Sequence, residues 1–599
     1  MTEKVLAPPP HAPAKEYETS FRQILAYLGP HKWPFIWTLV LSVLQDLTLL
    51  LLPVLASVAI DQMAEKNFPA MVITFIWLLL SLIAQAVVTW QKMWTNQRIG
   101  NEIIRTMRND LMLKMQEQNY TWLDGHPTGD LMSRTTSDVN LLKTFMAQQI
   151  AYFTREILMV FLVFAVMFWF NVTLGLFLLP FLGGLFVVMF FYRRKMGPLF
   201  FSSRQTFGRL TTVLQENITG IRVVRSFGRK KEEIRKFDRE SDTYFRQSVK
   251  LVKYQSLFDP TIRGINQVAM IIVIFIGGAL ALNPSSGFTF GKLFGFVILM
   301  NFVTEPVRFI TQFLGDMSKI NGACDRVTEV LNANSIIPEA PDATEIPPIQ
   351  GVVEFRHVWF SFKKDQHYEL KDVNFKTEPG EIIAILGATG SGKTALVNLI
   401  PRLYEVDKGA ILIDGQDIRS VTQKSLRRQV AVVAQESFLF SESIRNNIAF
   451  HDLDRAGDDD WLRRCANLAQ IDDWIMSLEQ GYDTVVGERG VTVSGGQRQR
   501  LCIARALFSR PHVLILDDAT SSVDVDTEYE IQRSFSDMFQ GTTTFIITQR
   551  LSTVRNADRI FVLENGEIVE QGSHEYLLGV EGGIYNKIYN TLKIEERSR

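Results

Sequence analysis

The sequence contains few cysteines and no excess of either charge. Its three cysteines, Cys324, Cys465 and Cys502, are scattered over 599 residues, so we expect packed thiols and neither a metal site nor a disulfide framework. Lys and Arg total 63 and Asp and Glu total 64, which gives a net charge of −1 and no indication of nucleic acid as a partner. Residues 1–15 lack the apolar core of a cleavable signal sequence, so we expect a disordered tail over 1–19.

Long apolar runs, in contrast, dominate the first half of the chain. Hydrophobic residues make up 47% of the sequence, and Phe alone occurs 42 times. A membrane-spanning helix needs about 20 predominantly apolar residues. Segments of this kind lie at 33–60, 70–89, 150–170, 172–192, 262–282 and 292–313. They predict an all-α, six-helix transmembrane domain over 20–331, with several spans continuing into long polar cytoplasmic helices.

The flanks of these runs predict how the chain lies in a lipid bilayer. Phe21, Ile24, Leu25 and Leu28 recur at helical spacing, which predicts a short amphipathic helix on a membrane surface. Basic residues follow the second and fourth spans, whereas the loops at the opposite ends carry almost no charge. The positive-inside rule therefore predicts cytoplasmic extensions and cytoplasmic termini. The half-size chain without a transit peptide fits a bacterial inner membrane.

A few charged residues interrupt the apolar runs. Asp46 lies in the middle of the first span, and two interpretations stay open: contact with a substrate, or a polar contact that fixes helix packing. For Glu305 and Arg308, near the inner end of the sixth span, we favour the structural interpretation.

Two turns stand at the far tips of the long extensions, at 124–130 and 216–227, with Gly125, Gly129 and Gly220 as turn residues. Their position suits contact with another domain, although plain loops would have the same composition. Residues 332–350 are rich in proline and acidic residues and predict an interdomain linker. An α/β domain is expected over 351–592, followed by a charged tail at 593–599.

A P-loop motif, G-x-x-x-x-G-K-[ST], opens this second domain. An apolar strand precedes it and an apolar helix follows it, which is the context that the motif needs to bind phosphate. Lys393 would contact the β- and γ-phosphates of ATP, and Thr394 would hold Mg²⁺. The loop consists of Gly387, Ala388, Thr389, Gly390, Ser391, Gly392, Lys393 and Thr394.

Two further motifs belong to the same chemistry. The apolar strand 513–516 ends in Asp517, whose carboxylate fits a Walker B ligand of Mg²⁺. A second anion-binding pattern precedes a helix and consists of Val493, Ser494, Gly495, Gly496 and Gln497. A simple P-loop enzyme does not need this second device, whereas a head-to-tail pair of such domains, each completing the ATP site of the other, would use it.

With these motifs the chain resembles a half-transporter of the ATP-binding cassette (ABC) exporter family, from about residue 21 to 592. The resemblance identifies residues 493–497 as the signature motif, with Val493 where Leu is usual, and residues 487–490 as an exporter-specific motif. It implies that Gln435 contacts Mg²⁺, that Phe362 stacks on adenine, and that Ser522 and Asp524 form the D-loop. The two tips then correspond to coupling helices.

Two positions depart from the family pattern. Asp518 stands where a glutamate normally polarises the attacking water, and Gln549 stands in place of the switch histidine. Aspartate is one methylene shorter, and a misplacement of about 1 Å can cost on the order of 100-fold in rate. Glutamine can bond to a phosphate but cannot carry the charge of histidine. Together Asp518 and Gln549 predict a site that binds ATP well and hydrolyses it poorly.

These observations predict an ATP-driven exporter of a hydrophobic drug, lipid or peptide. We favour a heterodimer with a second ABC half-transporter over a homodimer. In a heterodimer the intact signature at Ser494 would contribute to an ATP site in which the partner supplies the catalytic glutamate and histidine. The alternative hypothesis is an ATP-gated regulatory or channel-like membrane subunit that barely hydrolyses ATP. The substrate itself cannot be inferred from the sequence.

Overall fold

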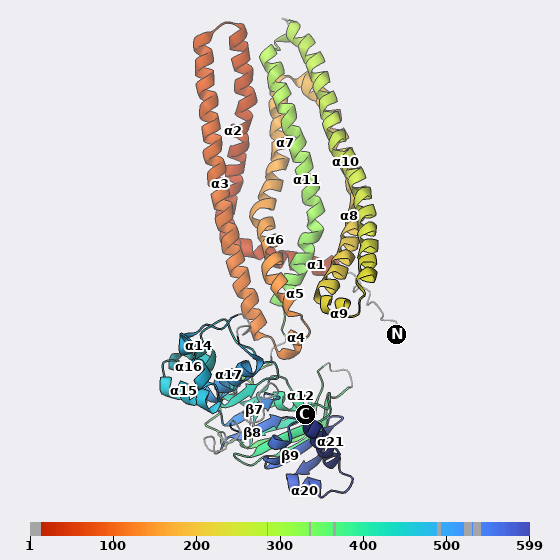
Figure 1. The fold of residues 1–599 in the computed structure, drawn as a ribbon. Helices are drawn as coiled ribbons and strands as arrows, with labels where there is room; N and C mark the ends of the chain where they lie inside the picture. Colours follow the sequence, from red (N-terminus) through yellow and green to blue (C-terminus); the bar gives the residue numbers. More distant parts are fainter. Residues whose placement is uncertain are drawn as a thin grey trace. The chain divides into compact units, whose positions relative to one another are not determined.

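The computed structural model describes residues 14–283, 286–334, 337–362, 367–487, 493–519, 530 and 541–598. The chain divides into two compact units, which are described separately. The membrane unit holds the described residues up to Gln116 together with Pro127–Ala333. The nucleotide unit holds Glu117–His126 and the described residues from Asn334 onward. Element labels follow Figure 1.

The membrane unit is entirely helical in the part that the structure describes, and six of its helical stretches are long and apolar enough to cross a membrane. This confirms the predicted six-helix transmembrane domain. Its long helices continue well beyond the apolar runs, and α8 and α10 pack along one another (Figure 1). The elements are α1 (Ala14–Leu25), η1 (Ala26–His31), α2 (Lys32–Ala64), α3 (Phe68–Glu117), α5 (Thr128–Ser133), η2 (Arg134–Asp138), α6 (Val139–Thr144), η3 (Phe145–Gln149), α7 (Ile150–Phe170), α8 (Val172–Thr219), α9 (Ile221–Ser226), α10 (Lys230–Leu282) and α11 (Phe290–Leu331).

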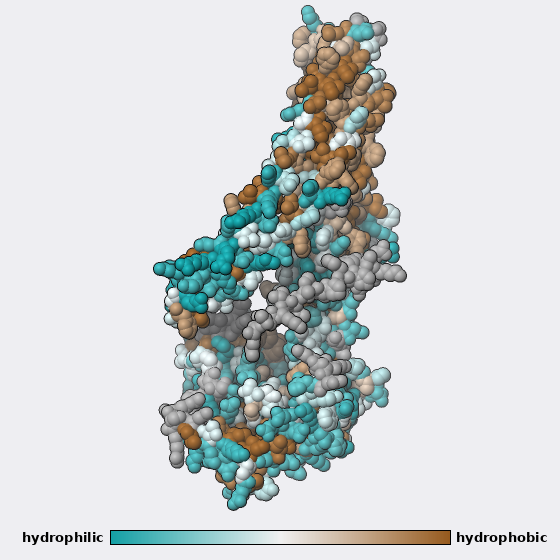
Figure 2. Space-filling view, turned by 90° about the vertical axis from the view of Figure 1, so that its right-hand side faces the viewer, coloured by the Kyte–Doolittle hydropathy of each residue, from teal (hydrophilic) through white to brown (hydrophobic). Residues whose placement is uncertain are grey.

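Apolar side chains of these helices point both inward and outward. Val163, Leu174 and Phe296 lie in a buried core between α7, α8, α10 and α11. Trp77 and Phe275, in contrast, are 60% and 79% exposed. Figure 2 shows hydrophobic residues gathered over the membrane helices. In water such exposure is costly, but in a bilayer the apolar outer surface is solvated by lipid.

Three boundaries differ from the sequence-based prediction. Helix α1 begins at Ala14, inside the tail expected over 1–19. Helix α21 (Ile584–Ser598) continues through most of the tail expected at 593–599. The described part of the expected linker belongs to the nucleotide unit from Asn334 onward. Both tail segments are parts of amphipathic helices, and the linker is held by hydrogen bonds to α13 (Gln423–Gln429).

The nucleotide unit contains two sheets. The smaller has the order β2-β1-β4-β5 and is antiparallel. The larger has the order β10-β9-β3-β8-β7-β6, with β9, β3, β8, β7 and β6 parallel and β10 antiparallel at one edge. The strands are β1 (Val353–Phe360), β2 (Leu370–Lys376), β3 (Ile382–Gly387), β4 (Lys408–Ile413), β5 (Gln416–Asp417), β6 (Val430–Val433), β7 (Val513–Asp517), β8 (Thr543–Ile547), β9 (Arg559–Glu564) and β10 (Glu567–Gly572).

The nucleotide unit has two main buried cores, one around α12 (Lys393–Leu399) and one in a cluster of helices that includes α15 (Asp459–Leu468) and α17 (Gly495–Phe508). One buried core joins α12 to both sheets, through Leu396, Ile385 and Phe545. Another core packs the helical cluster against β6 and β7. The remaining elements include α4 (Tyr120–Asp124), η5 (Ile418–Ser420), α14 (Ile444–Ile448), α16 (Asp472–Met476), α19 (Leu551–Arg555) and α20 (His574–Leu578).

Candidate nucleotide-binding site

The strand order of the larger sheet brings the predicted motifs together at the carboxyl ends of its parallel strands, which we call the P-loop edge. Strands β3, β8, β7 and β6 are parallel neighbours, so their carboxyl ends meet on the same side. The P-loop follows β3, Gln549 follows β8, Asp517 ends β7 and Gln435 follows β6. Ligands of open α/β sheets bind outside the carboxyl ends of the strands. Four motifs that are far apart in the sequence are therefore collected at one site.

The P-loop has a backbone that only glycine accommodates at its two ends. Gly387 has a φ of 153°, and a Cβ there would lie 2.3 Å from the carbonyl oxygen of Leu563. Gly392 has a φ of 100° and caps the N-terminus of α12, where a Cβ would lie 2.6 Å from the carbonyl oxygen of Glu369. The loop therefore keeps its backbone free of side chains where it turns into the helix. This geometry fits a phosphate group bound at the helix N-terminus.

Lys393 is folded over the same loop. Its Nζ donates hydrogen bonds of 2.8 Å to the carbonyl oxygens of both Gly387 and Ala388. Burial lowers the pKa of Lys393, and the carboxylates of Asp517 and Asp518 oppose this shift. A phosphate is a stronger acceptor than a carbonyl, so the ammonium group is placed to exchange loop contacts for phosphate contacts.

Asp517 and Thr394 supply oxygen atoms of the kind that Mg²⁺ prefers. Asp517 is 6% exposed at the end of β7. Burial raises its pKa, while a hydrogen bond with Thr394 acts in the opposite direction. A buried carboxylate beside a hydroxyl and a P-loop fits a hydrated Mg²⁺ ion, since the ion would offset the cost of burying the negative charge.

The two unusual residues lie beside this pair. Asp518 has a φ of 47°, and its backbone N–H donates to the carbonyl oxygen of Ile547 at 3.0 Å. This bond ties the residue after β7 to the end of β8, two residues before Gln549. Gln549 is exposed, and it lines a cavity of about 300 Å³ together with Gly387, Ala388 and α21 residues. The local fold thus places both side chains at the P-loop edge.

Phe362 follows the end of β1 and is partly buried. Its ring packs edge-on against Tyr404 at 5.1 Å and against Phe360 at 4.8 Å. Its backbone N–H donates to Glu369 Oε2 at 3.0 Å. The ring is therefore held rigidly by neighbours, as a stacking platform for a base requires.

The signature segment forms a complete helix start. Ser494 caps α17, and its Oγ accepts from the backbone N–H of Gln497 at 3.2 Å. In return Gln497 Oε1 accepts from the backbone N–H of Ser494 at 2.9 Å. This capping box fixes Gly495 and Gly496 in the first turn, where their backbone N–H groups and the helix dipole favour an anion. The sequence spacing Ser-x-x-Gln contained this signal.

Some predicted motif residues lie outside the described part of the chain, and the two tips lie at turns between helices. Ser522, Asp524 and residues 488–490 belong to the first group, and Val493 is buried beside α17. Of the two tips, the first is a turn between α4 and α5 that contains Gly125, with Gly129 in the first turn of α5. The second contains Gly220 between α8 and α9. Gln435 is exposed after β6.

One contact of the first tip was not predicted from sequence. Tyr404 donates a 2.8 Å hydrogen bond to Asp124 Oδ2 within the nucleotide unit. Tyr120, on α4, packs against the ring of Tyr404 at 5.9 Å. Tyr404 is thus in contact with both the predicted adenine platform and the predicted tip. No motif spacing links residues 280 positions apart, so only the structure could reveal this pair.

Asp46 lies in the membrane unit and is fully buried. Its Oδ1 accepts from Arg155 Nε at 2.7 Å, and Arg155 Nη1 donates to Glu156 at 3.1 Å. The contact joins α2 to α7, which agrees with the helix-packing interpretation. Glu305 and Arg308 form a 2.9 Å ion pair within α11. The substrate role of Asp46 stays a prediction.

Comparison with known proteins agrees with this geometry. Residues 35–307 match the family "ABC transporter transmembrane region", and residues 370–521 match the family "ABC transporter". The chain is 35% identical over 575 residues to an ATP-dependent lipid A-core flippase of Syntrophus aciditrophicus, covering 94% of this chain and 93% of the relative. It is 32% identical over 570 residues to the putative multidrug export protein YgaD of Bacillus subtilis, covering 94% and 97%.

A solved structure has the same fold. The structure of a bacterial Atm1-family ABC exporter with ATP bound superposes with a TM-score of 0.75, at 24% identity, over 94% of this chain and 98% of the other. Six apolar helices followed by an ATP-binding domain make this chain a multi-pass integral membrane protein. The chain belongs to the ABC transporter family, as an exporter-type half-transporter with one transmembrane region and one ATP-binding domain.

Proposed function

We propose that this chain is one half of a heterodimeric, ATP-driven exporter of an amphipathic or hydrophobic solute, and that its own ATP site hydrolyses slowly. The observation that carries the proposal is the pair Asp518 and Gln549, which follow β7 and β8 beside a P-loop and the buried Asp517. We place the protein in a bacterial plasma membrane with both termini in the cytoplasm.

ATP would bind with its phosphates at the N-terminus of α12 and its base on Phe362. Lys393 would transfer its hydrogen bonds from the loop carbonyls to the phosphates. Thr394, Asp517 and Gln435 would hold Mg²⁺, which supplies positive charge to the phosphate oxygens. Asp518 would have to orient the attacking water with a side chain one methylene shorter than glutamate, which makes the chemical step slow.

The signature segment would act on the partner. The capping box at Ser494 and Gln497 presents the N-terminus of α17 as an anion site. In a head-to-tail pair this site would complete the ATP site of the partner, which we expect to carry the glutamate and histidine that are missing here. Closure of the pair on ATP would be transmitted to the spans, and hydrolysis at the partner's site would reset the cycle.

The solute is proposed from the composition of the spans and from the relatives. The helices of the membrane unit are rich in Phe, Met and Leu, which suits a drug, a lipid or an apolar peptide. Relatives named for lipid A-core and for multidrug export support an amphipathic solute of this class.

ATPase activity measured in lipid tests the proposal. The purified chain alone should be nearly inactive, whereas a mixture with the half-transporter encoded beside it should turn over. Within the mixture, Ser494→Ala in this chain should reduce turnover much more than Lys393→Ala, because only the former belongs to the fast site. Ordinary turnover by the chain alone would contradict the slow site. Equal effects of the two substitutions would point to a homodimer.

The alternative, an ATP-gated regulatory or channel-like subunit, has a separate test. Vesicles that contain the pair should accumulate a fluorescent lipophilic dye against its gradient when Mg-ATP is added. A leak of ions down their gradient that depends on ATP, without accumulation, would favour the regulator instead.

A further inference from the structure

The chain between the two units is bound along the surface of the nucleotide unit. Residues 337–349, which we call the linker strap, follow the segment η5–α13. Gln423 Nε2 donates to the carbonyl oxygen of Ile337 at 2.9 Å, and the backbone N–H of Gln423 donates to Glu339 Oε1 at 2.8 Å. Further along, the backbone N–H of Ile346 donates to Ser425 Oγ at 3.0 Å. The strap is thus held at both of its ends.

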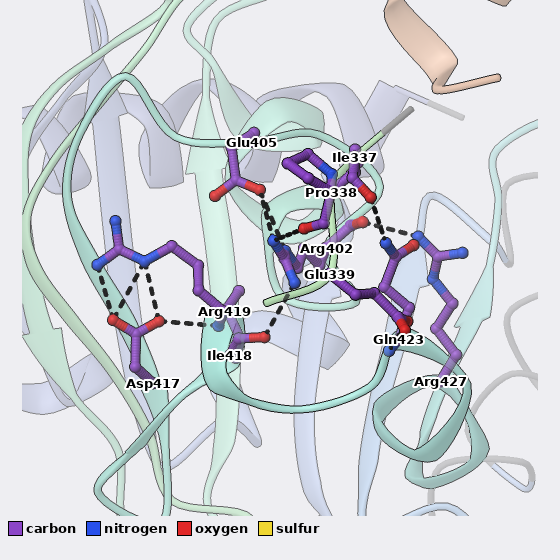
Figure 3. A network of polar contacts seen from close by, with 10 residues as sticks. All are labelled: Ile337, Pro338, Glu339, Arg402, Glu405, Asp417, Ile418, Arg419, Gln423 and Arg427. Carbon is purple, nitrogen blue, oxygen red and sulfur yellow. Dashed lines mark hydrogen bonds and ion pairs between the residues drawn. The ribbon is translucent and has the colours of Figure 1, made fainter. Parts of the chain in front are cut away.

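Arg402 clamps the beginning of the strap (Figure 3). Its side chain is 3% exposed. Nη2 donates to the carbonyl oxygen of Pro338 at 2.9 Å and to Glu405 Oε2 at 3.0 Å. Nη1 donates to the carbonyl oxygen of Ile418, at the start of η5, at 3.4 Å. One buried guanidinium therefore joins the strap, η5 and the segment that contains Glu405.

The backbone of Arg402 also ends the P-loop helix. Its N–H donates to the carbonyl oxygen of Leu399, and the N–H of Leu403 donates to that of Asn398, which is the hydrogen-bond pattern of a Schellman helix end. Arg402 occupies the left-handed position of this motif, with a φ of 54°, where glycine is usual. The backbone at this position favours glycine, so the presence of arginine is explained by the buried contacts of its side chain.

A second arginine, Arg427, binds the backbone at this helix end. Arg427, on α13, donates from Nη2 to the carbonyl oxygen of Arg402 at 2.7 Å and from Nε to that of Pro401 at 3.1 Å. Helix α13 leads directly into β6 and then to Gln435. The end of the P-loop helix, the strap and the segment before Gln435 thus share one set of polar contacts.

The number of residues between the membrane unit and the docked strap shows what this docking achieves. The membrane unit ends at Ala333, directly after α11, and a fully extended chain spans at most about 3.5 Å per residue. With the strap docked, the four residue steps from Ala333 to Ile337 can span at most about 14 Å. With the strap released as far as Gly351, the connection would reach about 60 Å. Docking of the strap therefore shortens the chain that connects α11 to the nucleotide unit.

We propose that Arg402 is a positioning residue that couples the P-loop helix to α11 through the docked linker strap. It provides a mechanical connection in addition to the tip at Asp124. Movement of the end of α12 on ATP binding would act on the strap through Pro338 and on α11 through the short connection between Ala333 and Ile337. This role rests on the proposed ATP-driven function.

Arg402→Gly is a suitable variant, because glycine keeps the left-handed helix end and removes only the clamp. Gln423→Met removes the amide donor to Ile337 and provides an independent release of the strap. Arg419→Ala is the matched control, because it removes a neighbouring guanidinium that is hydrogen bonded to Asp417 and not to the strap in the described residues. Hydrogen exchange of each full-length variant in lipid nanodiscs, with and without Mg-ATP, reports on all segments at once.

In the wild type, Mg-ATP should slow exchange in α12 and change exchange in α11. Arg402→Gly and Gln423→Met should speed exchange of the strap by about tenfold or more, keep the response of α12 and lose the response of α11. Arg419→Ala should behave as the wild type. A strap that stays protected, or an α11 response that survives release of the strap, would overturn the inference. A wild type without any response of α11 would instead count against the proposed ATP-driven function.

Discussion

The hydroxyl of Tyr404 donates a 2.8 Å hydrogen bond to Asp124 Oδ2 and joins α4 to the end of the P-loop segment. Burial raises the pKa of Tyr404, and the carboxylate of Asp124 adds to this shift. The same ring packs against Phe362 at 5.1 Å. A base stacked on Phe362 would therefore be two side chains away from the first tip.

Tyr404→Phe should loosen α4 without affecting ATP binding. The variant keeps the ring that packs on Phe362 and removes only the bond to Asp124. A hydrogen bond to a charged group contributes roughly 1.5–3 kcal/mol, so the free energy of local opening of α4 should fall by about this amount. Hydrogen exchange of residues 117–126 measures it. If Tyr404→Phe and Asp124→Ala together lower the opening energy by the sum of their separate effects, the two residues are not coupled.

Lys393→Ala should weaken ATP binding by this chain. The ammonium group that contacts the carbonyl oxygens of Gly387 and Ala388 belongs to the P-loop itself and would bond to a phosphate bound there. Loss of a charge-assisted bond worth about 1.5–3 kcal/mol corresponds to roughly a 10- to 150-fold loss of affinity. Titration of the purified chain with a fluorescent ATP analogue measures this. Lys408→Ala is a control of equal charge, because its ammonium lies over the Trp359 and Tyr368 rings. Unchanged affinity in Lys393→Ala would contradict the site.

Asp518→Glu combined with Gln549→His should raise the ATPase rate of the chain. The longer carboxylate would restore the reach to an attacking water, and histidine would restore a group that can carry charge. Recovery of a group misplaced by about 1 Å is worth on the order of 100-fold. Steady-state phosphate release by the chain in lipid measures the gain.

The matched control for this gain is Asp517→Glu in the same background. Asp517 is buried at the end of β7, where a longer side chain would displace the bond to Thr394, so this variant should lose activity. A double variant at positions 518 and 549 that is no faster than the wild type would show that these two residues do not limit hydrolysis.

Asp46→Asn should destabilise the membrane unit. The substitution removes one of the two carboxylate partners of the Arg155 guanidinium, which is 16% exposed, and leaves only Glu156 of the pair. Removing one member of a buried ion pair costs roughly 3–5 kcal/mol. The neutral pair Asp46→Asn with Arg155→Gln should recover a large part of this loss, although Glu156 then also loses its contact with Arg155. Thermal unfolding in detergent compares the three proteins. A stable Asp46→Asn protein with altered export would favour the substrate role of Asp46.

Much of the site could be predicted because its chemistry depends on short local patterns. Gly387 and Gly392 are required by the backbone of one loop, and Ser494 with Gln497 is a capping pattern within four residues. The apolar runs predict the spans for a similar reason, since every residue of a span meets the same lipid environment. In these cases the determining interactions lie within a few residues of one another.

The contacts that join the elements could not be predicted in this way. Tyr404 and Asp124 are 280 residues apart, and Arg402 reaches Pro338 across 64 residues. Nothing in the local sequence of Arg402 predicts a left-handed residue, because glycine is the usual signal for that helix end. The linker was predicted from its prolines and acidic residues, and those residues do not reveal that α13 offers matching donors.

The packing of α21 should depend on pH through His574. Its Nδ1 is hydrogen bonded to the hydroxyl of Tyr585, and burial, with a smaller contribution from the charge of Arg555, lowers its pKa. A histidine whose pKa is lower in the folded than in the unfolded state leaves stability fully present above about pH 6.5. As the pH falls below this value the unfolded state takes up the proton first, so the free energy of unfolding decreases.

Hydrogen exchange of α20 and α21 between pH 7.5 and 5.5, corrected for the intrinsic pH dependence of amide exchange, measures this loss. His574→Gln keeps a polar group beside Tyr585 but cannot be protonated, so the acid-induced opening should disappear. His451, whose pKa burial also lowers, lies in a different turn and serves as the internal control. Its pH response should survive in His574→Gln. If α21 opens equally in both proteins, another group controls the acid sensitivity of this helix.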